Sequence, residues 1–354
     1  MKSLWRDSKI KGKNSLDQLV YRSRLLGLET KLCVWGGGNT STKRLERNHL
    51  GQSTQVLWVK GSGSDLKVSE RKHFSPLRLD DLLPLLKRRE MSDEEMVDYL
   101  MRSLMDPKAP RPSIEALLHA FLPFQDIDHS HADAILSITN TARGRQIAKQ
   151  IYGNELLWIP YVKPGFLLSK KMFEAYQKNP RAKGAILENH GLITWGDSSK
   201  ESYSRMIRFV SQAERYIQKR AKGKRPLGRQ IHPSLSERER NAWLERFLPV
   251  IRKTVSKNKR TVLVTVSNPP ALEFVNSTLG PNVSQIGPAT PDHMLRTKRI
   301  PLYIRAGEKG PLGLTEKAAV KQIQNYADEH KTYFDKYAQL TRPHGTRSGR
   351  DGLA

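Results

Sequence analysis

The chain lacks the sequence features of secreted, disulfide-stabilised and membrane-spanning proteins. Its single cysteine, Cys33, cannot form an internal disulfide. No unbroken apolar run approaches the roughly 20 residues of a membrane span, and the opening MKSLWRDSKIKGKNSLDQL has no apolar stretch typical of a secretory signal. With 354 residues, 37% of them hydrophobic, the chain can still bury a sizeable core. These absences favour a cytoplasmic protein with no membrane partner.

Acidic residues are scarce beside basic ones. The 61 lysines and arginines outnumber the 35 acidic residues and give a net charge of +26. Such a surface attracts anions, including nucleic acid. However, the basic residues are dispersed, and their densest run, KRAKGKRPLGR (219–229), is interrupted by Gly and Pro and has no interleaved aromatic residues. We therefore do not expect a nucleic-acid partner. The positive charge is explained equally well by a host proteome rich in basic proteins and by attraction of an anionic substrate.

Three histidines have the spacing of a metal site. His129 and His131 alternate in DHSHADA, so on a strand both imidazoles project from one face. His190 ends the apolar run GAILENH, and Gly191 after it permits a sharp turn. Three imidazoles with an open fourth position are typical of catalytic zinc. A lone His-x-His pair is more often a structural polar pair, so these histidines need support from other motifs.

A carboxylate completes the set. Glu115 stands near the start of PSIEALLHAFL, where Pro112 and Ser113 suit the cap or first turn of a helix. The sequence thus predicts that Glu115 points from a helix N-terminus, a position suited to proton transfer. Glu115 and His119 are also four residues apart and could form an ordinary pair on a helix surface. We interpret His119 as a structural residue.

Two glycine-rich loops suggest an anion site. KLCVW (31–35) and QVLWV (55–59) are predicted strands, and each leads into a Gly/Ser loop. Exposed backbone N–H groups in such loops can cradle a phosphate. Side chains that could assist are Asn39, Thr40, Ser62 and Ser113. Glycine turns are common, so neither loop is specific alone, and GGGNTS lacks the context of a dinucleotide fingerprint.

Five segments in this order and spacing resemble the class II aldolase/adducin family. They are GGGNTSTK (36–43), VKGSGSDL (59–66), PSIEALLHAF (112–121), DHSHADA (128–134) and ENHGLITWG (188–196). The resemblance covers roughly residues 14–220. Within the family, the chain is most similar to the aldolase part of bifunctional rhamnulose-1-phosphate aldolase/alcohol dehydrogenases. This similarity rests on the motif GGGNTS, on the later segment GPATPDHMLRTKRIP (287–301) and on the length of the chain beyond position 220.

The resemblance implies a fold and a reaction. The fold is α/β, with three α/β/α layers around a mixed, largely antiparallel central sheet, in a homo-oligomer that is usually a tetramer. The reaction is zinc-dependent cleavage of a ketose 1-phosphate, with rhamnulose 1-phosphate as the leading candidate, to dihydroxyacetone phosphate and lactaldehyde. One zinc ion per chain would be bound by His129, His131 and His190, with Glu115 exchanging a proton at carbon three.

The remaining site residues also follow from the resemblance. In the family the matching loop positions hold the substrate phosphate, which transfers this role to Asn39, Ser62, Gly63 and Ser113. Tyr161 in WIPYVKPGF matches a tyrosine that assists at the aldehyde end from a neighbouring subunit, although a packing role fits it equally well. Many small aldolases have Ser-Ser-Glu where this chain has Ser113-Ile114-Glu115, so one expected hydroxyl is missing.

The expected domains are 1–225, an aldolase/adducin-like domain; 226–340, an α/β extension; and 341–354, a disordered tail that suggests truncation before a dehydrogenase domain. We predict helices at 15–28, capped by Ser15, at 241–253 and at 318–340, and a strand at 259–268. Two alternatives remain: a related sugar-phosphate epimerase or decarboxylase, and a non-enzymatic adducin-like or RNA-binding protein. Glu115 favours aldol cleavage over epimerisation.

Overall fold

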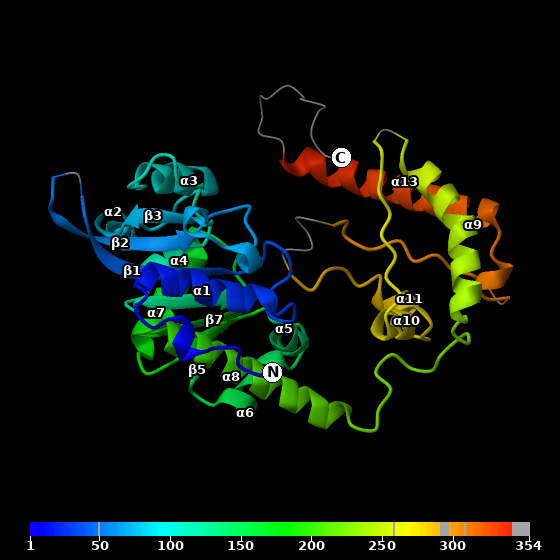
Figure 1. Ribbon diagram of the computed structural model, residues 1–354, viewed down its shortest axis with the longest axis horizontal. Coiled ribbons are helices and arrows are strands. Elements are labelled where there is room, and N and C mark those ends of the chain that lie inside the picture. The colour runs from blue at the N-terminus through cyan, green and yellow to red at the C-terminus, as the bar shows by residue number, and fades with distance from the viewer. Residues whose placement is uncertain (49, 258, 291–296, 308, 342–354) are drawn as a thin grey trace. The chain divides into compact units, whose positions relative to one another are not determined.

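A computed structural model describes residues 1–48, 50–257, 259–290, 297–307 and 309–341 (Figure 1). Residues 1–222, with 289–290, form one compact unit, and the described residues of 223–288 and 297–341 form a second. Within these ranges, no helix is both long and apolar enough to cross a membrane. The two units are described separately below.

The first unit is built on a seven-stranded sheet with the order β3-β2-β1-β4-β7-β6-β5. The strands are β1 (Asn39–Arg47), β2 (Ser53–Lys60), β3 (Phe74–Arg78), β4 (Asp126–Ser130), β5 (Leu156–Ile159), β6 (Gly184–Leu187) and β7 (Gly191–Gly196). Strands β5 and β6 pair in parallel, and every other neighbouring pair is antiparallel. The predicted mixed, largely antiparallel sheet is confirmed.

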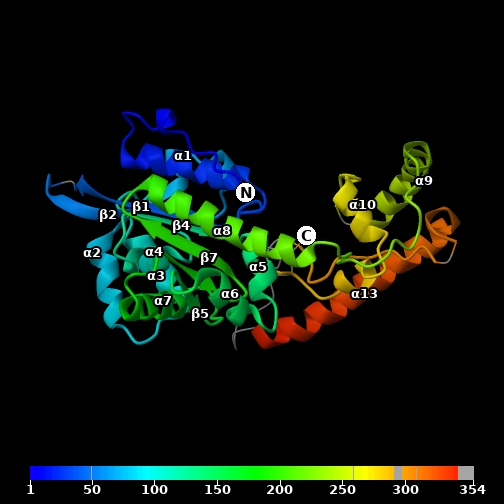
Figure 2. The ribbon, with the colours of Figure 1, turned by 90° about the horizontal axis from the view of Figure 1, so that it is seen from below.

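Helices cover both faces of this sheet (Figure 2). One layer contains α1 (Ser15–Leu28), α5 (Asp133–Thr139), α6 (Gly144–Tyr152) and α8 (Ser199–Ala221). The other contains α2 (Leu79–Leu82), α3 (Asp93–Arg102), α4 (Ala116–Phe121) and α7 (Phe166–Lys178). Short 3-10 helices lie at η1 (Asp7–Lys9), η2 (Leu66–Val68), η3 (Arg71–His73) and η4 (Leu83–Lys87). The predicted three-layer α/β/α fold is thereby confirmed.

Strand β4 places different chemistry on the two sides of the sheet. Successive side chains of a strand point to opposite faces. Ile127 packs in the apolar cluster that contains residues of α4 and α7, and His129 shares its face. Asp126 and Asp128 face the other layer, where both pair with the buried Arg22 of α1. The strand therefore directs its histidine toward α4 and its carboxylates toward α1.

Two local predictions for this unit were wrong. Residues 31–35 form turns rather than a strand, because the N–H groups of Leu32 and Cys33 both donate to the carbonyl oxygen of Glu29. The strand begins only at Asn39. The helix at 15–28 is present, but its cap is Asn14, whose side chain accepts a hydrogen bond from the backbone N–H of Asp17 at 3.0 Å.

The second unit is helical. It contains α9 (Glu237–Val255), α10 (Pro269–Val275), α11 (Gly280–Val283), η5 (Pro311–Gly313) and α13 (Glu316–Thr341). Its core centres on Phe247, which stacks on Trp243 and packs against Leu314. The helices predicted at 241–253 and 318–340 are confirmed.

The strand predicted at 259–268 is wrong, since the described residues of this segment form no strand. Val262 and Val264 are 85% and 84% exposed. Valine favours a strand only where a neighbouring strand and a buried face are available to it. Residues 291–296 of the segment 287–301, and residues 342–354 of the predicted tail, lie outside the described residues.

Candidate metal and acid–base site

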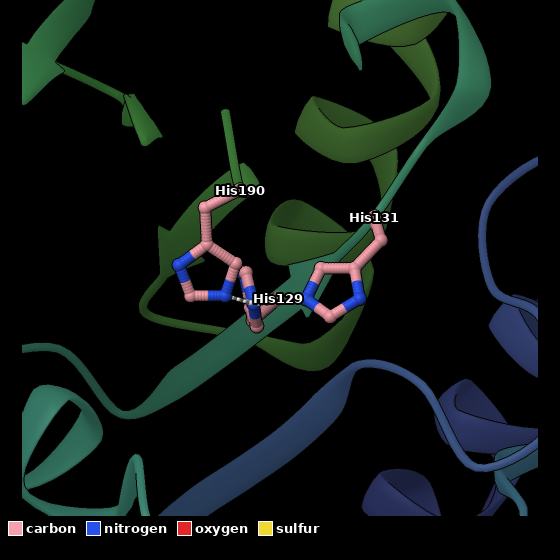
Figure 3. Close-up of side chains that lie close together, drawn as sticks. All are labelled: His129, His131 and His190. Atoms are coloured by element: carbon pink, nitrogen blue, oxygen red, sulfur yellow. Dashed lines mark hydrogen bonds between the residues drawn. The ribbon is translucent and has the colours of Figure 1, made fainter. Parts of the chain in front are cut away.

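Three imidazoles converge at the end of β4 (Figure 3). His129 lies in β4, His131 follows it directly, and His190 lies in the turn between β6 and β7. The Nε2 atom of His129 is 3.0 Å from Nε2 of His131 and 3.3 Å from Nε2 of His190. All three residues are buried. Pairing of β4 with β7 thus joins residues 61 positions apart in the sequence.

The donor atoms of this cluster fit a divalent cation. The Nδ1 atom of His129 lies 3.1 Å from the carbonyl oxygen of Leu192, so Nδ1 carries the proton and Nε2 presents a lone pair. Burial lowers the pKa of His129 to about 3, which keeps this ring neutral near pH 7. Tetrahedral zinc with Zn–N bonds of about 2.0–2.1 Å places neighbouring nitrogens about 3.3 Å apart. The two separations measured from Nε2 of His129, 3.0 Å and 3.3 Å, lie close to that value.

The turn that carries His190 depends on the backbone conformation of Asn189 and on the absence of a side chain at Gly191. Asn189 has φ 53°, the left-handed region that asparagine tolerates better than most residues with a side chain. At Gly191 a Cβ atom would lie 2.3 Å from the carbonyl oxygen of Ser130 and 3.1 Å from the ring of His129. A side chain at 191 would therefore push β4 and β7 apart and displace the imidazoles.

Glu115 places a carboxylate against this cluster. It is the N-cap of α4 and is 6% exposed. Its Oε1 atom lies 3.2 Å from Nε2 of His190, and its Oε2 atom lies 3.6 Å from Nε2 of His129. Oε1 has no hydrogen-bond partner among the described residues. The sequence prediction that Glu115 points from a helix N-terminus is confirmed.

Burial alone would raise the pKa of Glu115, but the neighbouring imidazoles of His129 and His190 outweigh it and hold this pKa well below its ordinary value. The site therefore places imidazole nitrogens beside a buried carboxylate. Such a set can bind a cation and can also accept and return a proton at one carboxylate oxygen.

Several of the predicted phosphate-binding residues lie beside Glu115. The side-chain nitrogen of Asn39 is 2.6 Å from Oε2 of Glu115 and 3.4 Å from the hydroxyl of Ser113. The loop with Ser62 is fixed to the segment before α4, because the N–H of Ser62 donates to the carbonyl oxygen of Arg111. Gly63, with φ 83°, has open space where a side chain would be. The structure thus places Asn39, Ser113 and the Gly/Ser loop next to one another.

Two predicted site residues are not brought into this group. Thr40 lies on the opposite face of β1, fully buried, and its hydroxyl is hydrogen-bonded to the hydroxyl of Ser23 at 2.6 Å. Tyr161 is 55% exposed on the segment that follows β5, and its backbone N–H donates to the carboxylate of Glu188. Among the contacts of the described residues, none joins the ring of Tyr161 to the imidazoles.

Sequence reasoning missed the polar partners behind Glu115. Ser41 and Asn39 project from one face of β1, and both are hydrogen-bonded to the ring of the buried His119. Two signals were available: the alternation of Asn39 and Ser41 along a strand, and the spacing of four residues between Glu115 and His119. Neither signal shows that His119 contacts Asn39 and Ser41 in the folded chain.

Two family models and one curated relative match this chain. The family model described as "Class II Aldolase and Adducin N-terminal domain" matches residues 17–217, and the model described as "Aldolase class II, second domain" matches residues 242–348. The chain is 45% identical over 325 residues to "Uncharacterized oxidoreductase YuxG" of Bacillus subtilis (strain 168), covering 92% of this chain and 47% of that protein. It thus spans about half the length of the curated relative that it matches.

A solved structure agrees with the family match. The N-terminal Class II Aldolase domain of a conserved protein from Thermoplasma acidophilum is 46% identical, with a TM-score of 0.57. The match covers 61% of this chain and 99% of that chain.

Proposed function

Because the chain belongs to the class II aldolase/adducin family, we propose that it is a metal-dependent aldolase, a carbon–carbon lyase that cleaves a ketose 1-phosphate. One observation carries this proposal: a buried carboxylate oxygen of Glu115, without a hydrogen-bond partner among the described residues, lies 3.2 Å from an imidazole of the three-histidine cluster. Rhamnulose 1-phosphate is the leading substrate, with dihydroxyacetone phosphate and lactaldehyde as products. That choice rests on the resemblance of the sequence motifs.

His129, His131 and His190 would hold one divalent cation, with zinc as the leading candidate. When bound, this ion would polarise the substrate carbonyl and neutralise the negative charge that develops during cleavage. The hydrogen bond from His129 to Leu192 fixes one ligand in the required tautomer, and the left-handed backbone of Asn189 sets the position of another, His190.

Glu115 moves the proton at carbon three. Cleavage breaks the bond between carbons three and four, takes a proton from the hydroxyl on carbon four and delivers a proton to carbon three. In the reverse, condensation, direction an ionised Glu115 removes the proton from carbon three, and its low pKa keeps it in that basic form. The same oxygen returns the proton when the reaction runs toward cleavage.

The substrate phosphate is assigned to the Gly/Ser loop with Ser62 and Gly63, to Ser113 and to Asn39. In support, the loop is fixed to the chain just before Ser113, and Gly63 lies in open space. A net charge of +26 favours the approach of a phosphorylated substrate. The word oxidoreductase in the name of the Bacillus relative describes a protein of which this chain covers 47%, so it does not define the reaction of this part.

The test is a combined metal and turnover measurement. The purified chain is freed of metal, reloaded with zinc, and assayed for release of dihydroxyacetone phosphate from rhamnulose 1-phosphate by a coupled reduction. We expect about one zinc per chain together with turnover. Glu115→Gln should keep the metal and lose turnover by about 10²-fold or more, as expected for loss of a general acid–base. Glu174→Gln, an exposed acid on α7, is the matched control.

Two outcomes contradict separate parts of the proposal. Zinc-loaded wild-type protein that releases no dihydroxyacetone phosphate would refute the substrate. Metal-replete Glu115→Gln protein with full activity would refute the role of Glu115.

A further inference from the structure

A line of hydrogen bonds connects β1 to the carboxylate of Glu115. The hydroxyl of Ser41 lies 2.7 Å from Nδ1 of His119, and Nε2 of His119 bonds to Oδ1 of Asn39. The side-chain nitrogen of Asn39 then bonds to Oε2 of Glu115 at 2.6 Å. Ser41 and His119 are fully buried, and Asn39 and Glu115 are 5% and 6% exposed. The line is therefore shielded from solvent at every step.

For a neutral His119 ring, only one arrangement of protons satisfies all of these bonds. The carboxylate of Glu115 can only accept, so Asn39 presents its NH2 group to it and its oxygen to His119. That oxygen can only accept as well, so Nε2 of His119 must carry a hydrogen. The remaining nitrogen, Nδ1, then accepts from the hydroxyl of Ser41. Burial lowers the pKa of His119 to about 3, so the ring remains neutral near pH 7.

The line also fixes the carboxylate relative to the imidazoles. Asn39 and His129 are register partners in the antiparallel pairing of β1 with β4. Asn39 holds Oε2 of Glu115, which leaves Oε1 turned toward Nε2 of His190 at 3.2 Å. The amide that holds the carboxylate and the strand that carries His129 therefore belong to one rigid pair of strands.

We propose that His119 is a positioning residue for Glu115. By donating to Oδ1 of Asn39, it holds the amide in the one orientation that donates to Glu115, and so directs the free oxygen of Glu115 toward the imidazole cluster. The inference rests on the proposed acid–base role of Glu115. In this arrangement the NH2 group of Asn39 donates to the carboxylate of Glu115 and also points at the hydroxyl of Ser113.

A purely structural histidine makes a different prediction. Buried polar groups are hydrogen-bonded in most proteins whatever their role. If His119 only filled the core, its loss would lower stability, and any effect on turnover would be independent of Glu115. A positioning residue acts through Glu115, so its effect on turnover should disappear once Glu115 has been replaced.

The first measurement is nitrogen NMR of metal-free protein labelled with 15N-histidine. The signals of His119 are assigned by their absence in His119→Gln. We expect the neutral tautomer with the proton on Nε2 throughout pH 5–8, with slow exchange of that proton. A proton on Nδ1, or a charged ring, would overturn the proposal. This measurement needs neither metal nor turnover, so it stands even if the aldolase assignment fails.

The second measurement compares His119→Leu, which removes the donor, with His119→Gln, whose amide can still donate to Asn39. We expect His119→Leu to lower kcat about ten- to a hundredfold with little change in KM, and His119→Gln to retain most of the activity. In a Glu115→Gln background, His119→Leu should cause no further loss. Equal losses in both backgrounds, or wild-type kcat in His119→Leu, would contradict the proposal. His330→Gln on α13 is the control for histidine replacement.

A spectroscopic readout separates this proposal from the aldolase assignment. In cobalt-loaded protein, the visible spectrum should change in the same direction in Glu115→Gln and His119→Leu, and remain near wild type in His119→Gln. A spectrum that responds to Glu115→Gln but not to His119→Leu would refute positioning by His119. If His119→Leu does not fold, Ser41→Ala, which removes only the far end of the line, should give a smaller change of the same kind.

Discussion

Replacing Arg22 with Met tests how far the first unit depends on one buried charge cluster. Arg22 is fully buried and forms ion pairs with Asp126 and with Asp128, the latter at 2.7 Å. Its guanidinium also donates to the hydroxyl of Ser199 at 2.8 Å and to the backbone carbonyl oxygen of Ser41 at 2.6 Å. Methionine matches the apolar stem but leaves two buried carboxylates without a counter-charge.

The expected loss is large. Removing one partner of a buried ion pair typically costs about 3–5 kcal/mol, because an uncompensated charge remains in the interior. Two carboxylates lose their partner here, so we expect a loss of at least about 3 kcal/mol in the free energy of unfolding. Arg22→Met combined with Asp126→Asn and Asp128→Asn should recover part of it, since no unpaired charge is left. Arg24→Met on the same helix removes an exposed arginine whose Nε donates to the carbonyl oxygen of Ser69, and should cost about 1 kcal/mol or less.

The assay is urea unfolding of metal-free protein, with hydrogen exchange of peptides from α1 and β4 to show that the change lies in the first unit. The reasoning is refuted if Arg22→Met lies within about 1 kcal/mol of wild type, or if the triple variant is less stable than the single one.

Three further predictions concern the metal site and the surface. Zinc at a hundredfold excess over its Kd should stabilise the wild-type protein by about 2.7 kcal/mol in thermal unfolding, a gain that chelation or His131→Ala removes. Asn189→Val should lower stability by about 1–3 kcal/mol and weaken zinc binding, because a β-branched residue resists a φ of 53°. The hydrogen bond from Arg208 lowers the pKa of Glu155 to about 2, below the unfolded value of about 4.3, so this pair stabilises the fold above about pH 4 and less as pH falls toward 2. Glu155→Gln should therefore cost up to about 1 kcal/mol at pH 7 and only a small part of that near pH 2, where about half of the folded carboxylates are protonated, measured by unfolding at both pH values.

Each of these has its own control. Asn189→Gly should remain close to wild type, since glycine adopts positive φ freely, and equal losses in Asn189→Val and Asn189→Gly would contradict the backbone argument. His232→Ala in the second unit should leave the zinc-dependent gain unchanged. A Glu155→Gln effect that is as large at pH 2 as at pH 7 would show that the carboxylate acts by packing rather than by charge.

Local patterns in the sequence predicted much of the fold. The helices at 15–28, 241–253 and 318–340 and the strand that became β2 follow from hydrophobic periodicity, which depends only on nearby residues. The same local reasoning failed at 259–268, where alternating valines form no strand because the segment has no strand partner among the described residues. It also failed at 31–35, where hydrogen bonds to Glu29 make turns.

For the candidate site, the sequence by itself identified the candidate side chains and predicted that His129 and His131 share a face, because alternation along a strand is a local property. Only the tertiary structure decided that His190 joins them, that Thr40 turns away to Ser23, and that His119 reaches Asn39. Those outcomes depend on which strands pair and in which register. Register is set by long-range packing, which no short segment contains.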